Sequence, residues 1–301
     1  MKAIITGFLD AEGHSTFEDQ MLFAQRHGID TICLRTYNGQ PIIEISDGDL
    51  KKISNDLKLN KMKIGILDLN IQSFNVSDQR QLNDALDEFK YMVKIADRLK
   101  INHVFYRLPK FNNVMDDFQE IEKVLTPFFE YAYKYSKKII LLPVHSYKVS
   151  TYAYIIKKMK VNHVYTAFDP VAIMINNEST TTAYRTLKST IGAFYCVDSD
   201  QRGQPQLMGH GKTNVLEIMK KLHRDRFDGF LLMDNRVYQT RFPNQTEKEG
   251  FFKKLFSQRK KQKETAMTTL SKAIFPYEET KNVTYDDILD NQIKLIRTVM
   301  K

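Results

Sequence analysis

Eight short apolar runs, each followed by a longer stretch with helical periodicity, constrain the fold of this chain more than any other feature. The runs are Ala3–Phe8, Thr31–Arg35, Lys63–Leu69, His103–Leu108, Lys138–Pro143, His163–Asp169, Gly192–Asp198 and Gly229–Asp234. The intervals between them leave room for one helix each, as parallel strands joined by crossovers require. Eight such units match a closed (β/α)8 barrel, which places functional groups at the carboxyl ends of its strands. We therefore predict an α/β protein, a TIM barrel formed as a single domain by residues 1–301.

An open, doubly wound sheet is the competing architecture. A dinucleotide-binding sheet of that kind carries a GxGxxG loop after its first strand. Gly7 and Gly13 do not supply such a loop. The chain has 301 residues, 42% of them hydrophobic, which suits one barrel with a sizeable core.

The helical stretches carry their own signals. Ser15 to Glu18 resembles a capping box that opens a helix through His27, and Gly28 then ends it. A second apolar stripe at helical spacing is typical of core packing rather than of a cofactor site. It consists of Leu82, Ala85, Leu86, Phe89, Met92, Val93 and Ala96.

One segment interrupts the alternation of predicted strands and helices. It lies before the closing helix, which is expected at Asp286–Met300. Residues 243–284 form an insertion between the last strand and that helix, and Lys253–Lys263 holds six basic residues and no acidic one. This run is either a solvated helix face or a patch that meets an anionic partner. The sequence leaves both readings open.

The composition limits which cellular compartment and which binding partners are expected. The net charge of +9 weakly favours anionic ligands. Cys33 and Cys196 lie in apolar runs and are expected to be buried, reduced thiols rather than a disulfide or a metal pair. No apolar run is long enough to span a bilayer, so we expect a cytoplasmic protein without a membrane partner.

Polar side chains follow each of the predicted strands. In chain order they are Asp10 and His14, Arg35, Asp68 and Asn70, Arg107, His145, Asp169, Asp198 with Arg202, and Asp234 with Arg236. Carboxylates and imidazoles at one rim are suited to hold a divalent metal or to move protons. The arginines are suited to bind a carboxylate or phosphate group.

Two of these positions and one further motif also have purely structural interpretations. Asp169 before Pro170 is equally well explained as the cap of the following turn. His145 alone is more often a hydrogen-bonded loop residue than a ligand. In Gly209-His210-Gly211, the glycines fit either close approach to a ligand or a tight turn.

Several segments together resemble a known family. They are FDP at Phe168–Pro170, IGAFYCVDSDQRG at Ile191–Gly203, GHG at Gly209–Gly211, FDGFLLMD at Phe227–Asp234, and the opening FEDQMLFAQRHGIDTICL at Phe17–Leu34. Their order is similar to that in the sugar-phosphate isomerase/epimerase family, the xylose-isomerase-like TIM barrels related to endonuclease IV. The resemblance covers most of residues 1–240.

The resemblance implies a divalent metal (Mn, Mg or Zn) held by Glu, Asp, His and Glu at the ends of strands five to eight. Asp169 matches the aspartate, and Asp234 stands where the last glutamate is expected. Pro143 and Tyr195 replace the other two ligands, and neither side chain is a good donor for a hard cation. The metal site is therefore predicted to be degenerate, with His145 as a candidate replacement ligand.

A second set of departures and matches concerns the substrate. Ala172 replaces a histidine that often contacts substrate in the family. Arg202-Gly203 resembles the substrate-contacting Arg-Gly of the keto-sugar epimerases.

These residues lead to three functional hypotheses. The first is a sugar or sugar-phosphate isomerase or epimerase that transfers a proton next to a carbonyl. In that case Asp234 would act as the base and His145 as the acid. Asp169 and Asp234 would be the remaining metal ligands. The substrate would be bound by Arg202, Arg107, His210 and Arg236. The second is a non-catalytic barrel that binds an anionic sugar or protein partner.

The third hypothesis, a DNA endonuclease, is the weakest, because the chain has only seven histidines and few at strand ends. Nucleic acid is accordingly not expected as a partner. The resemblance also implies a homo-oligomer, since family members often form dimers or tetramers.

Overall fold

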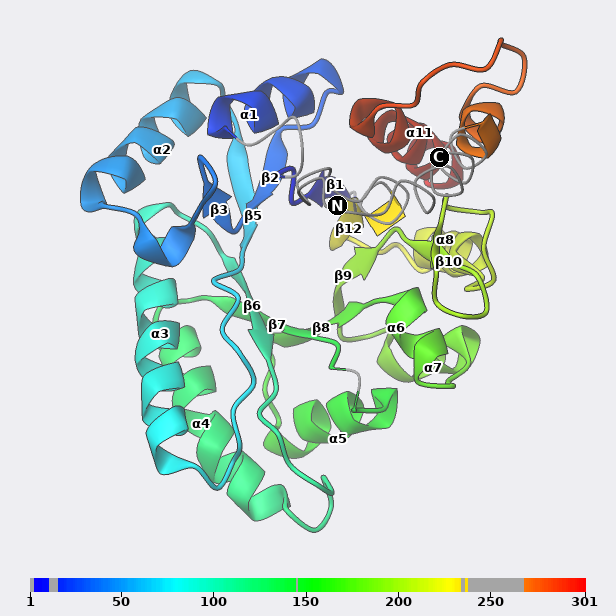
Figure 1. The fold of residues 1–301 in the computed structure, drawn as a ribbon. Helices are drawn as coiled ribbons and strands as arrows, with labels where there is room; N and C mark the ends of the chain where they lie inside the picture. The colour runs from blue at the N-terminus through cyan, green and yellow to red at the C-terminus, as the bar shows by residue number, and fades with distance from the viewer. Residues whose placement is uncertain (1–2, 11–15, 145, 234–235, 238–267) are drawn as a thin grey trace, which may run out of the picture.

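The computed structural model describes residues 3–10, 16–144, 146–233, 236–237 and 268–301. Eight parallel strands form one sheet in the order β1-β12-β9-β8-β7-β6-β5-β2. A parallel bridge between Phe8 and Cys33 joins the first and last of these strands, so the sheet curls into a ring. Figure 1 shows the strands inside and the helices around them. The predicted TIM barrel is confirmed.

The strands of the barrel start and end close to the predicted limits. They are β1 (Ile4–Gly7), β2 (Thr31–Leu34), β5 (Lys63–Leu67), β6 (His103–Arg107), β7 (Lys138–Leu142), β8 (Val164–Phe168), β9 (Ile191–Tyr195) and β12 (Phe230–Met233). Two small hairpins lie above the ring, β3 (Thr36–Tyr37) with β4 (Gln40–Pro41) and β10 (Asp198–Ser199) with β11 (Pro205–Gln206).

Helices follow the strands in sequence and cover the outside of the ring. They are α1 (Phe17–Arg26), α2 (Asp47–Leu59), α3 (Gln79–Arg98), α4 (Phe118–Lys134), α5 (Val149–Met159), α6 (Pro170–Ile175), α7 (Thr180–Leu187), α8 (Val215–Arg224) and α11 (Tyr285–Val299), with a 3-10 turn at Ile42–Glu44. The start of α1 differs from the prediction. Thr16, not Ser15, caps it by accepting a hydrogen bond from the backbone N–H of Asp19. Gly28 ends it in a left-handed conformation, as expected.

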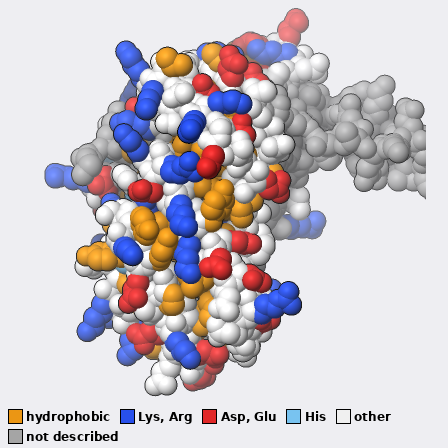
Figure 2. All heavy atoms as spheres, turned by 90° about the vertical axis from the view of Figure 1, so that its left-hand side faces the viewer, with side chains coloured by type: hydrophobic (Ala, Val, Ile, Leu, Met, Phe, Trp, Pro, Cys, Tyr) orange, Lys and Arg blue, Asp and Glu red, His pale blue; other side chains and the backbone are white. Residues whose placement is uncertain are grey.

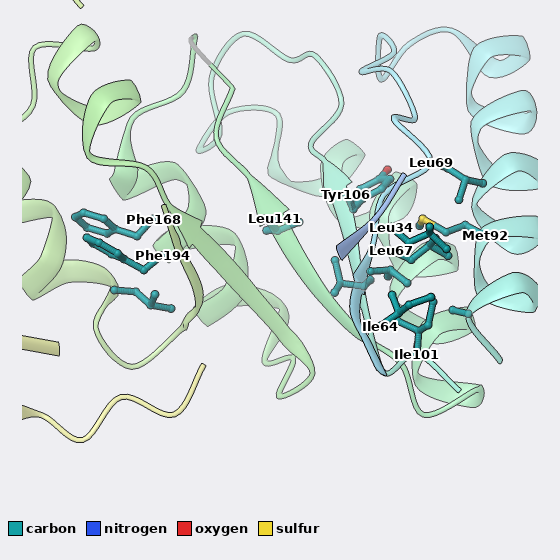
Figure 3. Close-up of a cluster of buried hydrophobic side chains, with 14 of the residues drawn as sticks. Leu34, Ile64, Leu67, Leu69, Met92, Ile101, Tyr106, Leu141, Phe168 and Phe194 are labelled. Carbon is teal, nitrogen blue, oxygen red and sulfur yellow. The ribbon is translucent and has the colours of Figure 1, made fainter. Parts of the chain in front are cut away.

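Alternation along the strands divides the core into two parts. Outward-facing residues of the strands pack against the helices: Leu34, Leu67 and Tyr106 share one buried cluster with Met92 of α3 (Figure 3). In the same cluster, Phe168 of β8 stacks on Phe194 of β9. Inward-facing residues fill the ring itself. They are Cys33, Ile66, Phe105, Ile140, Leu142, Ala167, Ala193, Phe230 and Leu232. The barrel is therefore a packed core with one open, polar end.

Two glycines make room for large rings at the amino end of the barrel. A Cβ at Gly65 would lie 2.8 Å from the ring of Phe230, and one at Gly192 would lie 2.8 Å from Cβ of Tyr165. His103 meets Phe230 edge to face at 4.8 Å between ring centroids. Aromatic rings therefore fill the inside of the barrel at this end.

The segment before the last helix is described only from residue 268. Leu270 and Val283 pack with Ile288 of α11 and with Leu207 and Val237. The rest of the predicted insertion, including the basic run Lys253–Lys263, lies outside the described residues. Whether residues 243–284 act as a separate insertion stays a prediction.

The surface shows no concentration of one charge on the face over α2 and α3. Figure 2 shows Lys and Arg side chains there intermingled with Asp and Glu, with hydrophobic side chains between them. No described helix is long and apolar enough to cross a membrane. Cys33 and Cys196 are buried free thiols, as expected.

Candidate active site at the carboxyl ends of the strands

The open end of the barrel, here called the mouth, is lined by the residues that follow the strands. Among the described residues, three arginines there pair with three aspartates: Arg35 with Asp10, Arg107 with Asp68, and Arg236 with Asp169. Each pair joins segments far apart in the sequence. The prediction that polar residues meet at this end therefore holds for these pairs, although the sequence did not say which residues would pair.

The pair after β1 and β2 has the best geometry. Arg35 donates from Nε to Oδ2 of Asp10 at 2.8 Å and from Nη2 to Oδ1 at 2.7 Å, a bidentate contact. The Thr36 hydroxyl donates to the same carboxylate at 2.8 Å. Burial raises the pKa of Asp10, but the hydrogen bond and charge of Arg35 outweigh it and leave that pKa below its ordinary value. The Arg35 side chain is still 40% exposed.

Aromatic rings form the floor under this side of the mouth. The guanidinium of Arg35 lies 5.0 Å over the ring of Phe8, and Phe8 contacts Phe105 of β6 at 5.8 Å between centroids. Arg107 follows Phe105 by two residues on the same strand, so both side chains point to the inside of the barrel. Its Nη1 lies 3.5 Å from Oδ1 of Asp68. Cations above an apolar ring floor can hold a ligand that has a carbon face and polar edges.

The pair after β8 and β12 contains the aspartate that matches the family. Asp169 caps α6, because its Oδ1 accepts hydrogen bonds from the backbone N–H groups of Val171 at 2.9 Å and Ala172 at 3.1 Å. Its Oδ2 accepts a hydrogen bond from Nη2 of Arg236 at 2.8 Å. The capping interpretation of the Asp-Pro dipeptide is thus correct, and the same carboxylate also binds a cation.

Two neighbouring strand ends carry Pro143 and Tyr195 where the family resemblance implies metal ligands. Pro143 follows β7 and has no side-chain donor atom. Tyr195 ends β9, and its ring lies under the guanidinium of Arg236 at 5.2 Å. In the described part of the chain, no cluster of three or more His, Cys, Asp or Glu side chains could hold a metal ion. The described donor set therefore does not fit the divalent metal that the family implies.

Asp198, another predicted strand-end carboxylate, organises a loop. It is 4% exposed and accepts hydrogen bonds from the backbone N–H groups of Ser199, Gly209, Gly211 and Thr213 and from the Thr213 hydroxyl. A Cβ at Gly211 would lie 2.1 Å from its Oδ1. The glycines of the Gly-His-Gly motif thus let the backbone wrap a buried carboxylate, as in the tight-turn interpretation.

Arg202 and His210 are not brought to the paired groups by any described contact. Arg202 is exposed in the turn between β10 and β11, and its backbone N–H donates to Asp200. His210 is exposed, and its backbone N–H donates to the carbonyl of Leu207. His145 and Asp234, the predicted acid and base, lie outside the described residues, as does His14. Their roles stay predictions.

The sequence names Arg35 among the strand-end arginines suited to bind a carboxylate or phosphate group but gives no role to Phe8. The contact between the two could have been predicted, because the first and second strands of a barrel are neighbours and their ends meet at one rim. Tyr195 was noted only as a lost ligand. Its position under Arg236 could not be read from the sequence, since the contact depends on a residue after the last strand.

Comparison with known proteins places this geometry in a family. Residues 21–251 match the model of the xylose isomerase-like TIM barrel. No curated protein matches the chain. The IOLI protein, solved with a zinc atom, has a TM-score of 0.65 at 16% identity, over 93% of this chain and 100% of that one.

Two epimerases are also similar in structure. A D-psicose 3-epimerase solved in the presence of D-fructose has a TM-score of 0.62 at 14% identity, over 91% of this chain and 99% of that one. The 3-keto-D-glucoside 4-epimerase of E. coli has a TM-score of 0.62 at 11% identity, over 77% and 92%. At these identities the likeness shows the fold alone. Together with the family match, it means that this chain belongs to the xylose isomerase-like TIM barrel family.

Proposed function

We propose that this chain is a sugar or sugar-phosphate isomerase or epimerase that works at the mouth of its barrel. The observation that supports it most is the Asp169–Arg236 pair, with the Arg236 guanidinium over Tyr195, at the end of the barrel where the active sites of TIM-barrel enzymes lie. A carboxylate and a guanidinium that meet at this end of a barrel suit a polar, oxygen-rich ligand.

Binding is assigned to the three arginines of the mouth. Arg35, Arg107 and Arg236 are 40%, 25% and 32% exposed in their side chains, while their aspartate partners are nearly buried. The aspartates fix the guanidinium groups, and the exposed part of each can meet a hydroxyl, carboxylate or phosphate oxygen. Phe8 is partly exposed and offers an apolar surface for the carbon face of a sugar, with the buried ring of Phe105 beneath it. Arg202 and His210 are retained as further substrate-binding residues.

The proposed reaction transfers protons at the carbon next to the substrate carbonyl. A base, assigned to Asp234, removes a proton from the carbon next to the substrate carbonyl, and the electron pair of that C–H bond forms an enolate. An acid, assigned to His145, returns a proton to a carbon or oxygen of the same intermediate. Return of a proton to the opposite face of the same carbon gives an epimer. Delivery of the proton to the former carbonyl carbon, with transfer of the hydroxyl proton to the former carbonyl oxygen, gives an isomer. No external oxidant or reductant is needed.

The test is exchange of substrate hydrogen with deuterated water, followed by NMR for a panel of ketoses and their phosphates. We expect exchange with at least one sugar, loss of that exchange in Asp234→Asn, and wild-type exchange in Arg185→Gln, a change on the exposed side of α7. If the folded wild-type chain exchanges no hydrogen with any sugar of the panel, the catalytic proposal is wrong.

A binding barrel without catalysis is the second candidate. It is favoured by one observation: both oxygens of Asp169 already accept hydrogen bonds, from two backbone amides and from Arg236. Calorimetry distinguishes the two candidates. A sugar phosphate that binds with no exchange in deuterated water indicates a binding protein, whereas binding with exchange indicates the enzyme.

The proposal extends to compartment, assembly and partners. A cytoplasmic protein that forms a homo-oligomer and takes a small sugar or sugar phosphate fits the family match and the finding that no described helix could cross a membrane. Sedimentation of the purified chain tests the oligomer. A gel shift with abasic DNA that weakens steeply with salt would revive the nucleic-acid alternative.

A further inference from the structure

The strand ends beside Arg236 lack most of the metal ligands that the family resemblance implies. Three strand ends in succession, those of β7, β8 and β9, present Pro143, Asp169 and Tyr195. The family resemblance implies metal ligands at these three ends. Only one of the three side chains, Asp169, has an oxygen suited to a hard divalent ion.

The carboxylate of Asp169 is already paired with the guanidinium of Arg236. Asp169 is 5% exposed, its Oδ1 is held by two backbone amides, and its Oδ2 lies 2.8 Å from Nη2 of Arg236. A metal ion at Oδ2 would have to displace the guanidinium. It would also stand beside a positive charge, which disfavours a second cation at this distance.

Tyr195, which stands at the end of β9 in place of the expected histidine ligand, suits the guanidinium of Arg236. The guanidinium of Arg236 lies 5.2 Å from the centroid of the Tyr195 ring. A flat, delocalised cation stacks favourably on an aromatic face, whereas a small divalent ion needs lone-pair donors. A tyrosine is thus a poor neighbour for a metal and a good one for an arginine.

From these contacts we infer that the guanidinium of Arg236 is the resident cation of this site, in place of a divalent metal, and that it binds the substrate oxygen that becomes negative during proton transfer. The second half rests on the proposed function. Asp169 and Tyr195 hold the guanidinium from two sides, and 32% of the Arg236 side chain is accessible to a ligand. A fixed positive charge aimed at a developing enolate oxygen lowers the barrier to forming it.

The first experiment measures directly whether the site binds a divalent metal. The full-length chain is treated with EDTA, dialysed, and titrated with Mn²⁺ alone, with bound metal followed by electron paramagnetic resonance. We expect no stoichiometric binding by the wild-type chain. One equivalent of Mn²⁺ that is lost in Asp169→Ala would overturn the inference, whatever the activity of the protein.

The second experiment measures the role of the guanidinium in the exchange reaction. Arg236→Ala is expected to lower kcat by about 100-fold, the usual effect of removing one donor from a developing oxyanion. Guanidinium ion added to this variant is expected to restore part of the rate, and Mn²⁺ is expected to restore none. EDTA should leave the wild-type rate unchanged.

Two further variants keep this test decisive. Arg236→Gln with Asp169→Asn replaces the buried ion pair by a neutral one, so it serves if Arg236→Ala fails to fold, and we expect the same loss of kcat. Arg185→Gln is the matched control for the loss of one positive charge. A wild-type rate in the folded double variant, or activity that depends on Mn²⁺, would contradict the inference.

The two proposals fail in different ways. If no sugar shows exchange, the proposed function and the oxyanion role fail together, while the Mn²⁺ titration still decides which cation the site holds. If exchange occurs but requires a bound metal, the proposed function stands and the assignment of Arg236 is wrong.

Discussion

The two ends of this barrel are built from different chemistry. At the amino end, Phe230 and Tyr165 fill the space that Gly65 and Gly192 leave open, and His103 packs against Phe230. At the mouth, inward-facing positions carry arginines paired with nearly buried aspartates. One end stabilises the barrel by packing, and the other holds exposed charges in fixed positions. Changes at the first should therefore act on stability and leave sugar binding unchanged, whereas changes to the paired charges at the second should also alter binding.

The largest expected effect is at the amino end. Phe230 is 5% exposed and packs inside the ring, so Phe230→Ala should lower the free energy of unfolding by about 3–5 kcal/mol. Phe230→Leu keeps most of the volume and should cost less than about 1.5 kcal/mol. Urea unfolding measures both. Sugar affinity per folded molecule should be unchanged in either variant, and a large loss of affinity would show that the two ends are not independent.

The loop above β9 gives the next largest effect. Asp198 accepts hydrogen bonds from four backbone amides and one hydroxyl, so Asp198→Ala leaves several donors unsatisfied and should cost about 3 kcal/mol. Asp200→Ala in the same hairpin is the control. Asp200 accepts hydrogen bonds from two exposed backbone amides and should cost about 1 kcal/mol. Equal costs would mean that Asp198 does not organise this loop.

A histidine at the amino end should make stability depend on pH. Burial, together with the charge of Lys138, lowers the pKa of His103 to about 4. The unfolded chain therefore binds a proton that the folded chain does not, and stability should fall as the pH drops from about 6.5 to about 4, by about 1–3 kcal/mol. His103→Gln should lack this decline, which unfolding curves across that range would show.

A smaller pH effect is expected at the mouth. The pKa of Asp10 is lowered overall, because the hydrogen bond and charge of Arg35 outweigh burial. A carboxylate of this kind contributes stability above its unfolded pKa and loses that contribution as the pH falls through its folded pKa. Arg35→Gln should cost about 1 kcal/mol at neutral pH, because the arginine is largely exposed. The difference from the wild type should shrink below about pH 4. A constant difference down to pH 2 would contradict the pairing.

The sequence was sufficient for the fold because each strand carries a local signal. All eight barrel strands appear where apolar runs predicted them, and the closing helix begins at Tyr285, next to the predicted Asp286. The errors are at element ends, such as Thr16 in place of Ser15 as the cap of α1. These depend on single hydrogen bonds that several neighbouring residues could form.

The site was only partly predictable. The sequence identified Asp169, Arg107 and Arg236 as mouth residues and Pro143 and Tyr195 as lost ligands. It could not show that Asp169 and Arg236, 67 positions apart, form an ion pair, because pairing depends on how side chains meet across the ring. Asp198 appeared as one more candidate ligand, but its hydrogen bonds make it the centre of a loop.

The most direct test of the guanidinium as the cation of the mouth is a crystal of the full chain soaked with Mn²⁺ and examined for anomalous scattering. We expect the guanidinium of Arg236 on Asp169 and above Tyr195, with no anomalous peak between them. A strong peak within bonding distance of Asp169 and Asp234, with Arg236 turned away, would contradict that assignment.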